Sequence, residues 1–364
     1  MLVSLSEYAK MHDRSNDTIR RMAEHGVFPS AKKIGRNWVI EKEEPYPVMK
    51  HKKNQPISVV SLFSGCGGMD LGFKGDFDFL GRHYDRTKFN IVWANEIDHE
   101  ACKTYRQNLG DIVEGDIRQN FDLMPKYADV VIGGFPCQDI SINGKMLGIK
   151  GSRSSLYTVI VDTVKKINPK VFVAENVGSL MMKKNEFSWK KILEDFSALG
   201  YNIHYQLYHA EDYFVPQTRE RVFIVGTRKD LPEFTPPAPV SHLNPVSVKE
   251  ALQDLENVEQ NERFSHVWSM AKVSGQQGNR KLVADRPGYT MRAECHGNIQ
   301  FHYALPRRIS MREAARIQAF PDSFIFPTKL RATERQIGNA VPPVLAWYVA
   351  QSVQNVITGA DKND

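Results

Sequence analysis

One cysteine, one glutamate and two arginines have the types and spacing that covalent chemistry needs. Cys137 follows a proline after an apolar run, and the proline fixes the backbone so that the thiol is directed out of the strand end. Glu175 lies at the end of the next run, while Arg219 and Arg221 share one face of an extended segment. A single cysteine is usually buried and inert, but a thiol at a strand end beside these charges predicts a nucleophile with electrostatic support.

A glycine-rich turn predicts close approach of the backbone to a small ligand. Residues 64–68 read Ser-Gly-Cys-Gly-Gly between an apolar run and a helical stretch, and Gly65 and Gly68 permit a tight turn. No Gly-Lys-Ser/Thr follows, so this is not a Walker A loop and a phosphate ligand is not specially favoured. Plain turns also use glycines, so the nature of the ligand depends on the next two strands.

Acidic residues after those two strands favour a nucleoside. Glu96 can accept hydrogen bonds from ribose hydroxyls, and Asp116 can accept one from the amino group of a purine. Ile97 and Ile117 are placed to pack against the faces of the base. An adenosine without a pyrophosphate suits this set, and S-adenosylmethionine fits better than NAD.

Strands that alternate with helices must position these residues. Five continuous apolar runs predict buried strands, and three stretches between them predict helices. The strands are expected at 57–63, 90–96, 128–134, 170–176 and 221–227, and the helices at 99–110, 154–167 and 188–200. The alternation predicts an α/β fold with a doubly wound, Rossmann-like parallel sheet, whose ligands lie beyond the carboxyl ends of the strands.

The main domain is predicted to be interrupted by a second lobe. Residues 48–231 form its first part, after a charged linker that contains prolines. Residues 232–306 are proline-rich and then polar without a clear period, which indicates a smaller lobe. Residues 307–364 return to the main domain, with helical spacing in 311–320 and 343–357.

Residues 1–47 are predicted to form a unit of their own. Ser4 and Glu7 make a capping box that opens a first helix, a second helix spans Thr18 to Glu24, and two short strands surround a turn at 35–37. With its basic second helix and turn, this pattern resembles the winged helix-turn-helix of MerR-like and excisionase-like DNA-binding proteins. A small fold used for self-association is the alternative.

Nine motifs occur in the order of a known enzyme family. They are FSGCGG, NEID, GDI, GGFPCQ, SRSSLY, AENV, QTRER, RRISMREAARIQAFPD and QIGNAVPP. The chain resembles bacterial DNA (cytosine-5)-methyltransferases over about residues 57–231 and 307–345. The resemblance implies that the Cys137 thiolate adds to cytosine C6 and that C5 then takes a methyl group from S-adenosylmethionine. It also implies that Glu175 holds N3 and the exocyclic amine, and that Arg221 donates to O2 with Arg219 beside it.

The resemblance assigns further residues to the cofactor. They are Phe63, Gly65, Gly68, Glu96, Ile97, Asp116, Ile117, Pro136, Leu156, Asn339 and Val341. The last two belong to a motif that should pack beside the glycine loop. Asn176 is expected to order its strand end, and Gln318 with the Arg312–Glu313 pair to brace the second lobe.

Double-stranded DNA is the implied substrate, and the target base must leave the stack because its C5 is inaccessible there. The segment after Cys137 resembles the family's mobile loop that closes over DNA; a disordered basic loop is the alternative. Residues 232–306 become a target-recognition region, which is short for the family and suggests a short target. The residues expected to contact DNA are Ser141, Asn143, Lys145, Arg153, Thr290, Arg292 and His296.

Composition excludes several other classes. Hydrophobic residues make up 41% and charged residues 25%, as in globular proteins, and the net charge of +6 permits a polyanionic partner. No apolar run approaches the roughly 18 residues of a membrane span, and the N-terminal residues lack a secretion signal, so a cytoplasmic protein is expected. Four cysteines without a C-x-x-C pair predict neither a disulfide framework nor a metal site.

Three alternatives remain open. A regulator built on an inactive methyltransferase scaffold disagrees with the intact Cys137, Glu175 and Arg221, although a helix-turn-helix that represses its own operon would allow a dual role. A tRNA cytosine-5 methyltransferase disagrees with the missing Cys-Phe-Thr motif, and an amino-methyltransferase with the missing Asp/Asn-Pro-Pro-Tyr loop. The target sequence, a cognate restriction endonuclease and the oligomeric state, monomer or self-association through the N-terminal unit, are not given by the sequence.

Overall fold

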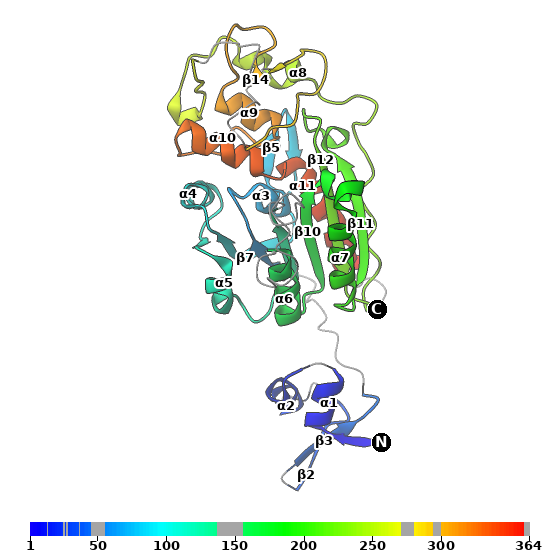
Figure 1. Ribbon diagram of the computed structural model, residues 1–364. Coiled ribbons are helices and arrows are strands. Elements are labelled where there is room, and N and C mark those ends of the chain that lie inside the picture. The colour runs from blue at the N-terminus through cyan, green and yellow to red at the C-terminus, as the bar shows by residue number, and fades with distance from the viewer. Residues whose placement is uncertain are drawn as a thin grey trace. The chain divides into compact units, whose positions relative to one another are not determined.

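The chain divides into two compact units, Met1–Lys53 and Asn54–Asp364. The computed structural model describes residues 1–12, 14–24, 26, 28–35, 37–44, 55–136, 156–270, 280–293 and 300–359 (Figure 1). None of the helices in these parts of the chain has the length and apolarity that crossing a bilayer requires.

The N-terminal unit packs two helices on a small antiparallel sheet. Its elements are β1 (Leu2–Ser4), α1 (Leu5–Met11), α2 (Asn16–Glu24), β2 (Lys32–Ile34) and β3 (Asn37–Glu41), with strand order β1-β3-β2. The predicted capping box is confirmed, because the Ser4 hydroxyl accepts from the Glu7 amide and the Glu7 carboxylate from the Ser4 amide. Tyr8, Ile19 and Ile40 belong to a separate apolar core. The sequence did not predict β1, whose three residues are too few to show a period.

The second unit is built on a mixed sheet of seven strands in the order β11-β12-β10-β9-β4-β7-β8. The strands are β4 (Ile57–Leu62), β7 (Phe89–Glu96), β8 (Val113–Glu114), β9 (Val130–Gly134), β10 (Val171–Val177), β11 (Asn202–His209) and β12 (Glu220–Thr227). All five predicted strands are present, and the doubly wound α/β fold is confirmed.

One part of the fold prediction was wrong, because the sheet is not wholly parallel. β12 runs antiparallel to both β10 and β11. The connection from β11 to β12 spans residues 210–219 and contains only the short helix η5 (Ala210–Tyr213). A crossover between parallel strands needs about a dozen or more residues and usually a helix, so the chain turns back antiparallel here.

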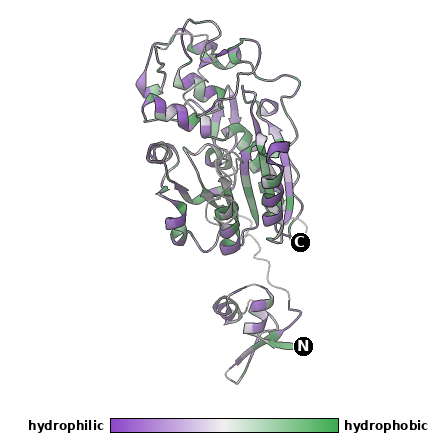
Figure 2. Cartoon of the chain, viewed as in Figure 1, coloured by the Kyte–Doolittle hydropathy of each residue, from purple (hydrophilic) through white to green (hydrophobic). Residues whose placement is uncertain are grey.

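Helices cover both faces of this sheet. On one face lie α3 (Gly68–Lys74), α4 (His99–Asn108) and α11 (Pro343–Gly359), and on the other α5 (Ile117–Asn120), α6 (Tyr157–Ile167) and α7 (Glu186–Ser197). Successive residues of β9 alternate between the two apolar cores, with Ile132 in one and Val131 in the other. Figure 2 shows the resulting apolar strands, with polar residues on the outer sides of the helices.

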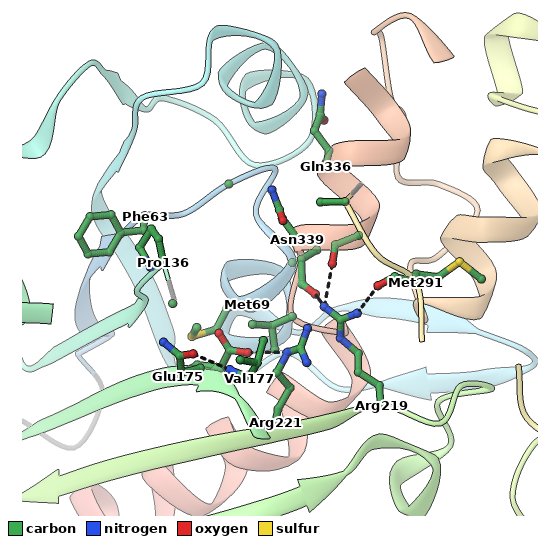
Figure 3. A pocket seen from close by; sticks show the side chains of 18 of the residues that line it. Phe63, Met69, Pro136, Glu175, Val177, Arg219, Arg221, Met291, Gln336 and Asn339 are labelled. Carbon is green, nitrogen blue, oxygen red and sulfur yellow. Dashed lines mark hydrogen bonds and ion pairs between the residues drawn. The ribbon is translucent and has the colours of Figure 1, made fainter. Parts of the chain in front are cut away.

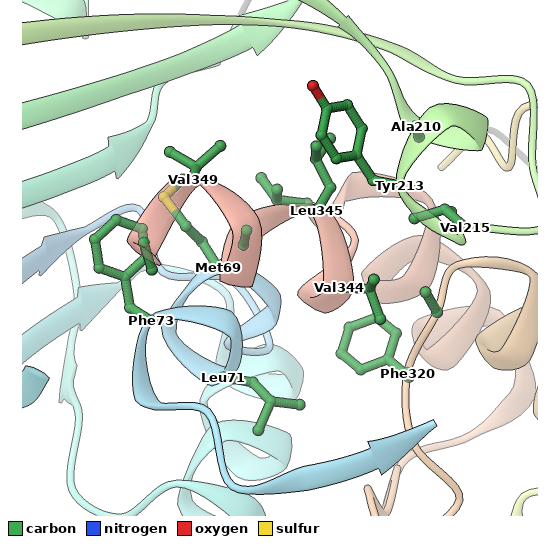
Figure 4. Close-up of a cluster of buried hydrophobic side chains, with 14 of the residues drawn as sticks. Met69, Leu71, Phe73, Ala210, Tyr213, Val215, Phe320, Val344, Leu345 and Val349 are labelled. Carbon is green, nitrogen blue, oxygen red and sulfur yellow. The ribbon is translucent and has the colours of Figure 1, made fainter. Parts of the chain in front are cut away.

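The contact between α3 and α11 is especially close (Figure 4). A Cβ atom at Gly72 would lie 2.5 Å from the Cβ of Ala346, so only glycine lets the two helix backbones approach this far. Met69 and Phe73 of α3 share the buried cluster with Val349 of α11. The C-terminal helix is thereby fixed beside the glycine loop from which α3 begins.

The remaining segments extend the same core. They contain β5 (Phe77–Phe79), β6 (Arg82–Tyr84), α8 (Val248–Leu252), β13 (Arg280–Lys281), β14 (Gln300–Phe301), α9 (Met311–Ile317) and α10 (Leu330–Asn339). Other short helices are η1 (Phe121–Leu123), η3 (Gly178–Met181), η4 (Lys183–Asn185), η6 (Gln253–Leu255) and η7 (Glu262–Phe264). Leu252, Leu282 and Phe320 join the apolar cluster that also contains α3 and α11. The described parts of the region from 232 to 306 therefore pack on the main core.

Candidate active site

A cavity of about 960 Å³ opens at the carboxyl ends of β4, β9 and β10. Its wall includes the glycine loop, the ends of β7 and β10, the start of β12, residues 290–293 and the end of α10 (Figure 3). Cofactor residues predicted from the sequence that line it are Phe63, Gly65, Gly68, Glu96, Pro136, Asn339 and Val341. These seven residues therefore share one cavity, and their part in cofactor binding stays a prediction.

The glycine loop has the geometry that its composition predicts. Gly65 and Gly67 have φ angles of 57° and 96°, in the left-handed region that favours glycine. A Cβ at Gly68 would lie 2.4 Å from the carbonyl oxygen of Val341. The expected packing of the C-terminal motif beside this loop is thus confirmed, since the two backbones touch.

Glu96 ties the loop to β7. One carboxylate oxygen accepts a hydrogen bond from the Gly65 amide at 2.9 Å, and the other accepts from the amides of Ile97 and Asp98 at 2.9 Å each. Burial raises the pKa of Glu96, while these three amides oppose the rise. Asp98 in turn caps α4 and receives a hydrogen bond from Arg335 of α10 at 2.7 Å.

Four predicted cofactor residues do not line the cavity. Ile97 is exposed, Asp116 caps α5 by accepting from the Arg118 amide, Ile117 is buried in the core, and Leu156 packs against that core. The Ile117 side chain is thus occupied by protein contacts. Their part in cofactor binding stays a prediction.

Glu175 and Arg221 form an ion pair in the cavity wall. Arg221 Nε lies 2.8 Å from Glu175 Oε1, and both side chains are 9% exposed. Burial raises the pKa of the Glu175 carboxyl, and the Arg221 guanidinium lowers it in part. A Cβ at Gly134 would lie 2.9 Å from Glu175 Oε2, so the glycine makes room for the carboxylate. Asn176 donates to the Phe135 carbonyl at 2.8 Å, which confirms its expected role in ordering the strand end.

Arg219 also lines the cavity, but its contacts differ from those of Arg221. Its guanidinium donates to the carbonyl oxygens of Met291, Gly338 and Ala340 at 2.7, 2.9 and 3.0 Å. The shared face predicted for the two arginines is therefore correct, while only Arg221 pairs with Glu175. A catalytic role for Arg219 stays a prediction.

Several predicted residues lie outside the described part of the chain. They are Cys137, Ser141, Asn143, Lys145, Arg153 and His296. Thr290 and Arg292 are described and line the cavity. Cys66 lines it too, but burial raises the pKa of its thiol to about 12, which makes it a poor nucleophile. Among the described residues, no group of three His, Cys, Asp or Glu side chains could hold a metal ion.

Asp70 is a cavity residue that sequence analysis missed. It is fully buried in α3 and accepts hydrogen bonds from Ser61 Oγ at 3.0 Å and from the Tyr105 hydroxyl at 2.8 Å. Burial raises the pKa of its carboxyl to about 6. The apolar neighbours Met69 and Leu71 were the available signal for burial, but an acid in the first turn of a helix is usually exposed.

Comparisons with known proteins show the family of the chain. The family model for the C-5 cytosine-specific DNA methylases matches residues 57–282 and 260–355. The chain belongs to this family. It is a DNA (cytosine-5)-methyltransferase, and S-adenosylmethionine is its cofactor.

The methyltransferase is similar to curated Type II methyltransferases along most of its length. It is 35% identical to M.NgoFVII of Neisseria gonorrhoeae over 84% of this chain and 88% of the relative. It is 34% identical to M.FnuDI of Fusobacterium nucleatum over 84% of this chain and 96% of the relative. The fold is that of the methyltransferase EhMeth of Entamoeba histolytica, with a TM-score of 0.58, 16% identity, and coverage of 85% of this chain and 100% of the other.

The cavity suits the cofactor of this family. Gly65 lines the cavity, and a Cβ at this position would have no atom within 4 Å, so the glycine leaves open space beside the loop. Glu96 offers a carboxylate, and Asn339 an amide, on the same wall. These groups fit an adenosine with an amino-acid tail.

Proposed function

We propose that the methyltransferase methylates C5 of cytosine within a short sequence of double-stranded DNA, through a covalent bond between Cys137 and C6 of a flipped-out base. The buried Glu175–Arg221 pair in the wall of the cofactor cavity is the observation that carries the proposal. It supplies a carboxyl and a guanidinium side by side, which match the ring edge of cytosine.

Cys137, Glu175 and Arg221 would form the bond to the base and stabilise the charge on its ring. The Cys137 thiolate forms a bond to C6, and the electron pair of the C5–C6 double bond becomes available at C5. Glu175 holds N3 and the exocyclic amine, and Arg221 donates to O2 as charge builds on the ring. S-adenosylmethionine, when bound, would supply the methyl group to the electron pair at C5 and would leave as S-adenosylhomocysteine when the sulfur–methyl bond breaks. Transfer of the C5 proton to solvent would then restore the double bond and expel the Cys137 thiolate.

The DNA contacts belong to two segments. Base flipping costs about a few kcal/mol, and residues of the loop after Cys137 would compensate for the lost stacking. Asn143 would fill the vacated place, while Ser141, Lys145 and Arg153 hold the backbone. Base edges would be recognised by Thr290, Arg292 and His296. The position of Thr290 and Arg292 on the cavity wall supports this assignment.

The organisation of the chain supports a dual role. We assign residues 1–47 to a winged helix-turn-helix, 48–231 and 307–364 to the catalytic domain, and 232–306 to target recognition. The exposed Lys32 and Lys33 of β2 and the exposed Arg21 of α2 support DNA binding by the N-terminal unit, and hence repression of the enzyme's own operon. The Type II names of the relatives support a place in a restriction–modification system, with an orphan methyltransferase as the alternative.

Transfer of labelled methyl groups tests the proposal. The purified full chain is incubated with labelled S-adenosylmethionine and either duplex DNA or tRNA, beside Cys137→Ser. We expect label in DNA alone and none with the variant. Label in tRNA would identify an RNA enzyme, and no label in either from protein that binds the cofactor would indicate the regulatory scaffold.

A further inference from the structure

We propose that Arg219 is a positioning residue that couples target recognition to the cofactor cavity, and does not contact the base. This inference rests on the proposed function of the site. The environment of the Arg219 side chain is unusual. The residue is 1% exposed, and its closest hydrogen-bond partners are three backbone carbonyls from two distant segments.

The first of these segments, residues 288–291, belongs to the region assigned to target recognition. Residues 288–291 lie along 216–218, with the Thr218 amide donating to the Gly288 carbonyl at 2.8 Å and the Gly288 amide donating to Pro216 at 2.9 Å. The Met291 amide donates to Gln217 Oε1 at 2.6 Å, and the Met291 carbonyl accepts from Arg219 at 2.7 Å. Gln217 and Arg219, just before β12, therefore bind both the amide and the carbonyl of Met291.

The second segment is the end of α10, which lies against the cofactor loop. Arg219 donates to Gly338 and Ala340, and the next residue, Val341, touches Gly68. A Cβ at Gly338 would lie 2.3 Å from the carbonyl carbon of Arg292, so the recognition segment and α10 are in direct backbone contact. Arg219 thus joins two segments that already touch each other.

Two buried glutamines complete the connection. Gln217 Nε2 donates to Gln318 Oε1 at 2.6 Å, and Gln318 Nε2 donates to the Ala340 carbonyl. Both glutamines are fully buried. A displacement of residues 290–293 by DNA would pull on Met291 and, through Arg219, on Ala340 and the cofactor loop.

The alternative is that Arg219 contacts the base directly, but its hydrogen bonds leave few donors free for that contact. Both terminal nitrogens of Arg219 already donate to carbonyls, and only its Nε has no partner among the described residues. Arg221, two residues further along, has its Nε on Glu175. Arg221 of β12 would therefore contact the base, and Arg219, which precedes β12, would connect the two segments.

Arg312 provides a matched control elsewhere in the fold. It is fully buried, and its guanidinium donates to the carbonyls of Phe264, Pro321 and Phe324 at 2.9, 3.1 and 2.8 Å. It does not line the cavity. Phe264 belongs to the region assigned to target recognition, but Arg312 donates to neither residues 288–293 nor the end of α10. Arg312→Lys therefore removes the same kind of bonds without touching the two segments that Arg219 joins.

The test compares Arg219→Lys and Arg312→Lys in the full chain. Two quantities are measured: the Kd of S-adenosylmethionine, and the ratio of kcat/KM for cognate DNA to that for DNA with one base pair changed. We expect Arg219→Lys to lower the ratio about tenfold or more and to weaken cofactor binding several-fold. Arg312→Lys should lower thermal stability similarly and leave both quantities unchanged.

Several outcomes decide against the proposal. A loss of kcat in Arg219→Lys with an unchanged ratio and an unchanged cofactor Kd would indicate direct contact with the base, and identical behaviour of the two variants would indicate a purely structural role. If Arg219→Lys does not fold, Gln217→Met loosens Met291 in the same way and must lower the ratio. If the wild type methylates no DNA, the proposed function fails, while an unchanged cofactor Kd in Arg219→Lys separately overturns the coupling.

Discussion

Arg221 Nε and Glu175 Oε1 are 2.8 Å apart in the wall of the cofactor cavity, on antiparallel strands whose register places Arg221 opposite Val177. Both side chains are nine-tenths buried, so neither charge is well solvated. A cytosine in the cavity would therefore meet a carboxyl and a guanidinium that fix each other's orientation.

Removing one member of this pair should destabilise the fold more than removing both. Arg221→Met leaves the Glu175 carboxylate buried without its partner, which costs about 3–5 kcal/mol. The double variant Arg221→Met/Glu175→Gln should recover part of that loss. Urea unfolding gives the free energy of unfolding of the wild type, both single variants and the double variant. Additive losses would show that the two side chains do not interact.

Glu175→Gln should lower the methylation rate by about 10²–10⁴, the typical contribution of a positioned acid or base. A glutamine amide at position 175 cannot exchange a proton with N3 as the Glu175 carboxyl can. Single-turnover rates at saturating DNA and cofactor measure this, with Kd values of both ligands as the control. A rate within threefold of the wild type would exclude Glu175 from the chemistry.

Asp70 should make the stability of the protein fall as pH rises from about 4 to above 6. Its pKa is raised to about 6 in the folded protein, so the folded state binds more protons than the unfolded state in this window. The resulting stability is complete below the unfolded pKa and is lost as pH passes the folded value. Its size is on the order of 1–3 kcal/mol.

Asp70→Asn isolates this contribution from the other carboxyls. Urea unfolding of both proteins is measured between pH 4 and 7.5. The free energy of unfolding of the variant should increase relative to that of the wild type as pH rises. A difference that is constant with pH would mean that the Asp70 carboxyl ionises normally.

Gly68→Ala should weaken binding of S-adenosylmethionine at least about tenfold. The added Cβ would lie 2.4 Å from the Val341 carbonyl, and neither backbone can move without reshaping the glycine loop. Gly200→Ala is the control, because its φ of +82° causes strain of about 1 kcal/mol with no atom within 4 Å. Calorimetric titration measures both. Equal cofactor affinity in the two variants would show that the glycine loop is not part of the cofactor site.

Deletion of residues 1–53 should leave site-specific methylation intact and abolish binding to the enzyme's own promoter. The N-terminal unit has its own core, and the family match begins at residue 57. Within the full chain, Arg21→Glu/Lys33→Glu should abolish the promoter shift, while Lys10→Glu on α1 should not. Promoter binding that survives the deletion would contradict a helix-turn-helix function.

Local patterns were sufficient to predict the elements that carry the site. Continuous apolar runs rich in β-branched residues identified five of the seven sheet strands, because strands buried on both faces are nearly continuously apolar. The missed β11 is only partly buried, so its sequence lacks that signal. The antiparallel direction of β12 depends on the length of the connection at 210–219, and no local preference of β12 itself encodes it.

The contacts of single side chains were predictable only where a motif names them. The motifs bring Glu175 and Arg221 to one cavity wall, whereas the carbonyl partners of Arg219 come from residues 72 and 119 or more positions away. Such contacts are decided by how the segments pack. Ile117 shows the same limit, since its burial under the sheet follows from the position of α5.

The most direct measurement is bisulfite sequencing of plasmid DNA from cells that express the wild type, Cys137→Ser or Arg221→Met. The account predicts 5-methylcytosine at one short sequence motif with the wild type, and none with Cys137→Ser. Arg221→Met should give strongly reduced methylation at the same motif. Methylation that persists in Cys137→Ser would contradict the covalent route, and its absence from cells with folded, cofactor-binding wild type would contradict a DNA substrate.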